Sequence, residues 1–190
     1  MSDRRAPRST ARARLRTATR GEHEAVDALF SRFDLSDLGR YAHFLRHQAA
    51  AHLPVEAALE RGGAATLLDD WPARRRGHLL RRDLADLGAE PGPPAAAPAF
   101  GSVAAVLGGL YVLEGSRLGG AVLRGRLPAG APARFLAAPA PPGAWSRLLA
   151  LLEDELGREA DLAAAVAAAK AVFGVFEQVG RRDVETALGR

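Results

Sequence analysis

The chain has no cysteine and only one lysine, Lys170, among its 190 residues. The lack of cysteine excludes disulfide bonds, thiolate metal sites and cysteine nucleophiles. No uninterrupted apolar run reaches the ~18 residues that suggest a membrane span, and no apolar signal segment follows the Arg-rich N-terminus. We therefore expect a cytoplasmic protein without a membrane partner.

Positive charge is only slightly in excess, since the formal net charge is +4. Nearly every basic residue is arginine, which is typical of a genomic composition bias. A basic surface could attract nucleic acid, acidic proteins or small anions, and a solvated Arg/Glu surface is the plainer interpretation. No zinc-finger, RRM or KH signature is present, so a nucleic-acid partner is not expected.

Strand patterns are also missing, because no segment alternates convincingly and no Asn-Gly hairpin signal occurs. The helical periodicity predicts an all-α fold, a single bundle-like domain over residues 11–188 behind a disordered basic lead at 1–10. Pro54 is expected to bend or interrupt the second helix. The expected helices are 10–33, a second starting at Ser36 or Asp37, 71–88, 101–127, 145–156, and a sixth from about 161, capped by Asp161, to 187, with loops at 89–98 and 128–143.

The fourth expected helix is unusually rich in glycine. Each interior glycine costs a helix about 1 kcal/mol relative to alanine, so something must require a bare backbone. Close helix–helix packing is one interpretation, and a flat ligand lying against the backbone is the other. The segment alone does not decide between them. Its glycines are Gly108, Gly109, Gly115, Gly119, Gly120 and Gly125.

The first expected helix carries a histidine beside an apolar stripe. Asp27 lies four residues after His23, on the same face, where its carboxylate can accept a bond from one ring nitrogen and leave the other for a metal. Arg16 and Arg20 lie on roughly the same face and could meet the carboxylates of an anionic ligand. An ordinary charge cluster on a helix surface is the alternative.

Taken together, these segments resemble the haem oxygenases. LRTATRGEH, residues 15–23, is similar to their proximal helix. YVLEGSRLGG, residues 111–120, is similar to the distal helix of the bacteriophytochrome-associated bacterial branch. The likeness extends from about residue 15 to 181, and further matching positions are Trp71, Asp83-Leu84, Leu87-Gly88, Ala169-Lys170, Phe173 and Phe176.

The resemblance implies the all-α haem oxygenase fold and a role for each position. His23 would be the axial ligand of the haem iron and Asp27 would orient it. Arg16 and Arg20 would approach the propionates. The distal face would be lined by Gly115, Gly119 and Gly120.

Ser116 departs from the resemblance, because many members carry an aspartate there. A serine donates and accepts hydrogen bonds but carries no charge, so Arg117 or an ordered water would have to help in proton delivery.

The implied activity is oxidative cleavage of haem to biliverdin, carbon monoxide and ferrous iron, with haem as both substrate and cofactor. No dinucleotide fingerprint is present, so electrons would come from a partner such as a ferredoxin or a reductase. A biliverdin-binding photoreceptor is a further possible partner. The alternatives are a non-catalytic haem-binding or haem-transfer protein, a haem-free enzyme of the same fold, and a basic helical interaction module.

Overall fold

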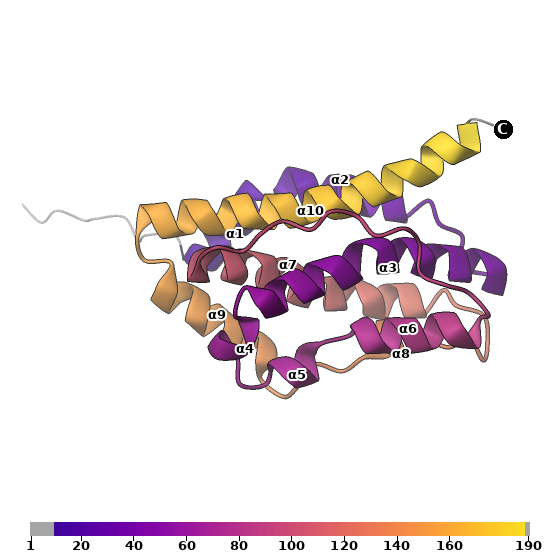
Figure 1. The fold of residues 1–190 in the computed structure, drawn as a ribbon, viewed down its shortest axis with the longest axis horizontal. Helices are drawn as coiled ribbons and strands as arrows, with labels where there is room; N and C mark the ends of the chain where they lie inside the picture. The colour runs from indigo at the N-terminus through magenta and orange to yellow at the C-terminus, as the bar shows by residue number, and fades with distance from the viewer. Residues whose placement is uncertain (1–9, 189–190) are drawn as a thin grey trace, which may run out of the picture.

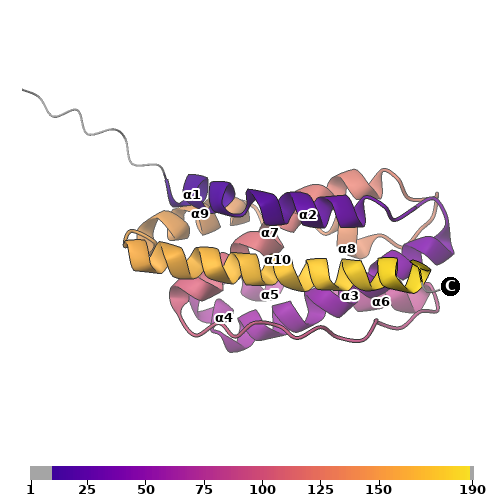
Figure 2. The same cartoon turned by 90° about the horizontal axis from the view of Figure 1, so that it is seen from above.

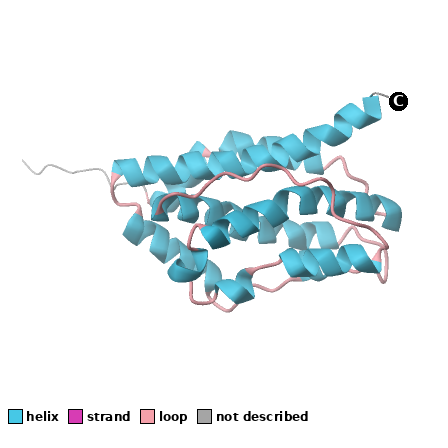
Figure 3. Ribbon diagram, in the orientation of Figure 1, coloured by secondary structure: helices cyan, strands magenta, loops and turns pink. Residues whose placement is uncertain are grey.

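The structure, a computed structural model, describes residues 10–188. Within this range the chain forms helices and loops and no strand, which confirms the predicted all-α fold (Figures 1 and 3). Residues 1–9, most of the expected basic lead, lie outside the described range. The helices are α1 (Ala11–Ala18), α2 (Arg20–Phe30), α3 (Leu38–Arg61), α4 (Ala64–Leu67), α5 (Trp71–Arg74), α6 (Gly77–Asp86), α7 (Val103–Arg124), α8 (Arg134–Ala137), α9 (Ala144–Glu155) and α10 (Glu159–Leu188).

The first expected helix is divided in two. Thr10, which we had assigned to the lead, caps α1 by accepting a bond from the Ala13 N–H at 3.2 Å. At Thr19 the backbone leaves helical geometry, with φ −109° and ψ 9°, so that α2 begins at the next residue. α2 then ends at Phe30, three residues before the predicted end.

α3 is a single long helix. Asp37 caps it, as predicted, because its carboxylate accepts bonds from the backbone N–H groups of Gly39 and Arg40. The helix runs on through Pro54, so the expected interruption does not occur. Proline has no backbone N–H to donate to the Ala50 carbonyl, which accepts the Ala95 N–H at 2.8 Å instead. Val55 and Leu59, which follow Pro54, are fully buried in the core.

The segment that follows contains more breaks than predicted. The helix expected over 71–88 is two helices, α5 and α6, because Arg75 adopts an extended conformation between them. It ends near Gly88 as predicted, since that glycine has a φ of +64° that favours glycine over other residues. Residues 89–102 form an extended strap along α3, held by the Ala95 N–H on the Ala50 carbonyl at 2.8 Å.

α10 is the longest of the described helices and runs along one face of the bundle, where α1, α2, α3 and α7 all pack against it (Figures 1 and 2). It begins at Glu159, so Asp161 lies in its first turn and is not its cap. Its stretch Glu159–Arg182 is long and apolar enough, by length and composition, to cross a membrane, and half of the window is buried inside the bundle. The sequence expectation overlooked this segment because Lys170 interrupts the apolar run.

The second expected loop, 128–143, contains the short helix α8. Phe135 of α8 is buried and its backbone N–H donates to the fully buried Asp83 carboxylate at 2.8 Å. Its ring lies between two polar groups, 5.1 Å from the His52 ring and 4.8 Å from the Arg76 guanidinium carbon. α8 therefore closes the core beneath α7.

Candidate functional site

His23 lies on the exposed side of α2. Its Nδ1 is 3.1 Å from the Asp27 carboxylate, as the i, i+4 spacing predicted, and its side chain is 61% exposed. The ring also meets the edge of Phe173 on α10, with centroids 5.8 Å apart. Nε2 has no partner among the described residues, so the ring is oriented on one side and available on the other.

The glycines of α7 divide into two groups with different surroundings. A Cβ on Gly108 would lie 2.1 Å from the Ala165 carbonyl oxygen of α10, and one on Gly109 would meet the Phe100 ring at 2.6 Å. By contrast, a Cβ on Gly115 or Gly119 would meet nothing within 4 Å. Close packing therefore explains the glycines in the first half of α7, whereas Gly115 and Gly119 in the second half face open space.

Two large apolar side chains share the face of the open glycines. Leu118 and Val122 are 73% and 72% exposed, and they lie three and seven residues after Gly115 on one side of the helix. We call Gly115, Leu118, Gly119 and Val122 the open stripe. Large apolar groups that face solvent along a bare helix backbone are typical of a surface that an apolar ligand covers.

Gly120 differs from the glycines of the open stripe. It is buried, and a Cβ there would lie 3.2 Å from the Leu136 carbonyl oxygen of α8. The bare backbone at this position allows α7 and α8 to approach each other. Gly120 therefore lies on the packed side of α7.

Cross-helix contacts place His23 level with the open stripe. Near one end, burial raises the pKa of Tyr111 on α7, and the charges of Arg12 and Arg16 on α1 are close enough to oppose that rise. Near the other end, the Arg126 guanidinium donates to the Phe33 carbonyl at 3.2 Å. His23 contacts Phe173 of α10, and Gly108 of α7 packs against Ala165, eight residues earlier in the same helix. Because α7 and α10 run in the same direction (Figure 1) and both rise about 1.5 Å per residue, α7 comes level with His23 near Ser116.

The two predicted anion-binding arginines are both exposed. Burial is the larger influence on the pKa of Tyr111 and raises it, while the positive charge of Arg16 lowers it. Arg16 therefore lies near the phenol. Arg20 is solvent-exposed one residue past the break between α1 and α2. Sequence reasoning missed Tyr111 as a site residue, and its position four residues before Gly115 could have pointed to it.

Ser116 is tied to an arginine that sequence reasoning also missed. Its hydroxyl donates to the Leu113 carbonyl and accepts from the Arg76 guanidinium, each at 2.7 Å. Arg76 is 4% exposed and also donates to the Leu113 carbonyl at 2.9 Å. Burial and the nearby Arg117 lower the pKa of Arg76 to about 9, so the guanidinium stays charged at pH 7.

Arg117, the predicted helper of Ser116, points away from the open stripe. Its guanidinium lies 3.3 Å from the buried Glu114 carboxylate and also donates to the carbonyls of Ala138 and Arg74. Arg74 is a further partner of Glu114, at 3.6 Å. These contacts involve Nε, Nη1 and Nη2 of Arg117, and they join α5, α7 and the 138–143 loop.

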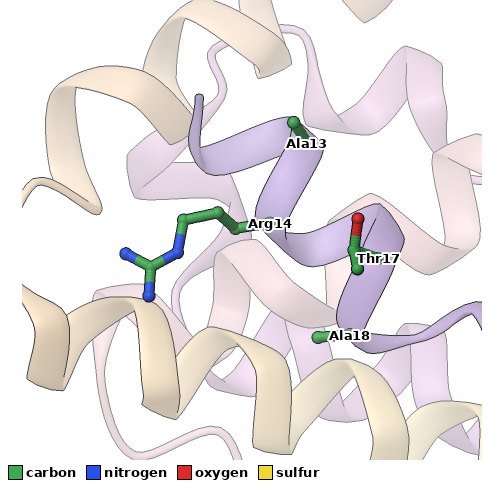
Figure 4. A pocket seen from close by; sticks show the side chains of 4 residues that line it. All are labelled: Ala13, Arg14, Thr17 and Ala18. Atoms are coloured by element: carbon green, nitrogen blue, oxygen red, sulfur yellow. The ribbon is translucent and has the colours of Figure 1, made fainter. Parts of the chain in front are cut away.

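A small cavity of about 280 Å³ lies on α1 and is lined by Ala13, Arg14, Thr17 and Ala18 (Figure 4). It is slightly smaller than the ~300–1,000 Å³ typical of enclosed ligand sites. Neither His23 nor the open stripe borders it. The Arg14 guanidinium is paired with Glu159 of α10 at 2.6 Å.

The residues present fit a haem. The open stripe offers a flat apolar surface without side chains at two positions, and His23 at the same level offers one free nitrogen for a metal. Arg16 and Tyr111 place a cation and a phenol near one end, where carboxylates could bind. The fold and the site define a class of all-helical proteins. In this class, a histidine held by a carboxylate lies at the level of an open, glycine-rich helix face.

Comparison with known proteins agrees with this description. No family model matches the chain. It is 39% identical over 146 residues to the heme oxygenase of Xanthomonas campestris pv. campestris (strain 8004), an alignment that covers 74% of this chain and 88% of that one. This similarity shows that the chain belongs to the haem oxygenase family.

Solved structures show the same fold. The NO- and CO-bound heme oxygenase of Neisseria meningitidis aligns with a TM-score of 0.76 and 26% identity, covering 91% of each chain. The heme oxygenase of Leptospira interrogans aligns with a TM-score of 0.69 and 20% identity, covering 90% of this chain and 98% of that one. The predicted resemblance to haem oxygenases is therefore confirmed at the level of the family.

Proposed function

We propose that the protein cleaves haem oxidatively to biliverdin, carbon monoxide and ferrous iron, with electrons from an external donor. One observation carries the proposal: a histidine oriented by Asp27 and Phe173 lies level with glycines that face open space. When bound, the haem would supply the oxygen and redox chemistry. The chain would then supply binding, orientation and hydrogen bonds.

His23 is the proposed axial ligand. The Asp27 carboxylate would accept a hydrogen bond from Nδ1–H, which would fix the tautomer and leave the Nε2 lone pair for iron. Phe173 limits rotation of the ring from the other side. His23 would thus hold the iron of a bound haem through one neutral imidazole.

Arg16, Arg20 and Tyr111 are the proposed partners of the propionates. Arg16 and Tyr111 belong to different helices, α1 and α7, so a carboxylate between them would join the two sides of the site. Arg20 is exposed near the same end and adds a second cation. Because both arginines are exposed, each of their ion pairs is expected to be worth only ~0.2–1 kcal/mol.

On the side of the haem that faces α7, the backbone of Gly115 and Gly119 would orient the haem. The absence of side chains there would leave room for a small ligand between the haem and the helix. Ser116 uses its own proton on the Leu113 carbonyl, so its oxygen can only accept further bonds. Arg76 holds the hydroxyl in place and puts a positive charge beside it, opposite in sign to the aspartate that many family members carry at this position. Gly120 and Arg117 would act indirectly, through the packing of α7.

The finer assignments of partner and location also belong to this proposal. The sequence similarity of residues 111–120 supports the bacteriophytochrome-associated branch, with a photoreceptor as recipient of the biliverdin. A net charge of +4 with exposed arginines supports an acidic ferredoxin or a reductase as electron donor. A cytoplasmic location is consistent with a chain that has no cysteine.

A single turnover tests the activity. The purified protein is loaded with hemin, supplied with reductant and oxygen, and followed by the loss of the Soret band and the rise of biliverdin absorbance. We expect stoichiometric biliverdin. A stable histidine-ligated haem that survives reductant and oxygen would instead favour a haem-binding or haem-transfer protein, and no Soret band with hemin would exclude both.

A further inference from the structure

The break between α1 and α2 is located at a buried polar residue. Thr19 is 3% exposed, and its hydroxyl donates to the Leu15 carbonyl at 2.8 Å. The same carbonyl also accepts the Thr19 backbone N–H at 3.0 Å. A threonine that bonds back to the carbonyl four residues earlier bends a helix, because one acceptor must serve two donors.

The break lies between the two parts of the proposed site. Arg16 lies on α1, three residues before Thr19, and His23 lies on α2, four residues after it. The His23 N–H still donates to the Thr19 carbonyl at 3.0 Å, so any change of the backbone at Thr19 is passed directly to His23. The angle at Thr19 therefore sets the direction of the histidine relative to the arginine.

Each helix is also fixed to a different part of the bundle. α1 is held by Leu15, which is fully buried, and by the Glu153 carboxylate of α9, which accepts the Ala11 N–H at 2.9 Å. α2 is held by the Lys170–Glu22 ion pair to α10, at 2.7 Å. α1 and α2 are thus each fixed by a different neighbour, and the angle between them is determined at Thr19.

We infer that Thr19 is a positioning residue for haem. It would set the orientation of the bound ring by fixing the angle between the iron ligand His23 and the propionate partner Arg16. The inference rests on the proposed function. The Thr19 hydroxyl acts through the backbone and does not touch the ring. Without it, α1 and α2 would join more nearly as one helix, and a haem held by His23 and Arg16 would be bound in a different rotation.

The test replaces Thr19 by valine, which has the same shape and lacks the hydroxyl. Thr19→Ser restores the hydroxyl, and Thr17→Val makes the same change at an exposed threonine of α1. Each variant is loaded with hemin and cyanide, and the haem methyl resonances are recorded by proton NMR. Their pattern reports the rotation of the ring and does not depend on turnover. Thermal unfolding of the haem-free proteins is measured alongside.

We expect Thr19→Val to unfold within a few degrees of the wild type and to give a different haem methyl pattern. Thr19→Ser and Thr17→Val should keep the wild-type pattern. An unchanged pattern in Thr19→Val, with haem bound through histidine in the wild type, would overturn the inference and leave the proposed function intact. A wild type without histidine-ligated haem would overturn both. If valine impairs folding, Thr19→Ala removes the hydroxyl with less crowding and is judged by the same pattern.

Discussion

At the scale of single residues, the geometry around His23 determines what the ring can do. Nδ1 lies 3.1 Å from the Asp27 carboxylate and the ring packs against Phe173, so the imidazole keeps one nitrogen without a partner among the described residues. A solvated surface histidine needs neither restraint. The two contacts therefore favour a ligand role over the charge-cluster interpretation that the sequence also allowed.

We predict that His23→Ala loses the imidazole-ligated ferric spectrum while the fold survives. The side chain is largely exposed, so its removal leaves no cavity in the core. Haem is still expected to bind weakly, because the open stripe and the arginines remain. Absorption and electron paramagnetic resonance spectra of the hemin complex, with far-UV circular dichroism as control, check this. An unchanged spectrum would mean that another residue binds the iron.

Arg76 and Ser116 should respond differently to substitution. Ser116→Ala removes the acceptor for Arg76 and the donor to the Leu113 carbonyl, but that carbonyl keeps its bond from Arg76, so we predict a mild loss of turnover. Arg76→Met removes the buried charge and should slow turnover more, with free energy of unfolding changing by about 1–3 kcal/mol for the lost buried bonds. Single-turnover rates and urea unfolding of the three proteins distinguish the cases. Equal rates for wild type and Arg76→Met would exclude the assigned role.

At the scale of elements, α7 carries two functions in one helix. Its first half approaches α10 so closely that Gly108 has no room for a side chain, while Gly115 and Gly119 have empty space beside them. The first group is explained by packing. The second is not, because an exposed helix with alanine at these positions would be more stable by up to ~1 kcal/mol at each. The cost is understandable if a ligand needs the space.

We predict opposite effects for the same substitution in the two halves of α7. Gly119→Leu should keep or raise the melting temperature and lose biliverdin formation, because the side chain occupies the space between haem and helix. Gly108→Leu should lower stability by ~1–3 kcal/mol or more, since its Cβ alone would overlap the Ala165 carbonyl. Thermal unfolding and single-turnover yield are measured for both. A full biliverdin yield from a folded, haem-loaded Gly119→Leu would show that haem does not lie against the open stripe.

Sequence patterns predicted some elements well and others poorly. The caps of long helices are local, so Asp37 and the end at Gly88 could be read from neighbouring residues. The break at Thr19 could not, because a threonine side chain bends a helix only when burial denies it another partner. Arg76 could not either, since its link to Ser116 joins positions 40 residues apart through the folding of α6 beneath α7.

At the scale of the whole molecule, the core contains an ionisable pair that joins α3 to the start of α6. His52 is 2% exposed, and its Nε2 lies 3.2 Å from the Glu56 carboxylate. That carboxylate also accepts the backbone N–H groups of Arg76 and Gly77, at 2.7 and 3.1 Å. Glu56 therefore caps a helix from another part of the chain, and the fold depends on its charge.

The last prediction concerns how this pair responds to acid. Burial lowers the pKa of His52, more than the bond to Glu56 raises it. Burial raises the pKa of Glu56, but the His52 ring and the two N–H groups outweigh it and lower that pKa to about 2. Ordinary values in an unfolded chain are ~6.5 for His and ~4.3 for Glu. When the pH drops below either of these ordinary values, that group binds a proton in the unfolded chain but not in the folded one. The free energy of unfolding therefore decreases as the pH decreases.

We therefore expect the free energy of unfolding to decrease below about pH 6.5 through His52, and again between about pH 4.3 and 2 through Glu56, the second step amounting to about 3 kcal/mol. Urea unfolding of the haem-free protein from pH 8 to pH 4 measures the first step. His52→Gln keeps a donor for Glu56 but cannot titrate, so it should flatten the slope between pH 7 and 5. His78→Gln, at an exposed histidine of α6, should leave that slope as in the wild type. If His52→Gln instead loses stability below pH 7 as steeply as the wild type, the acid sensitivity arises from other groups. The result would mean that the wild-type His52 imidazole takes up no proton when the protein unfolds in this pH range.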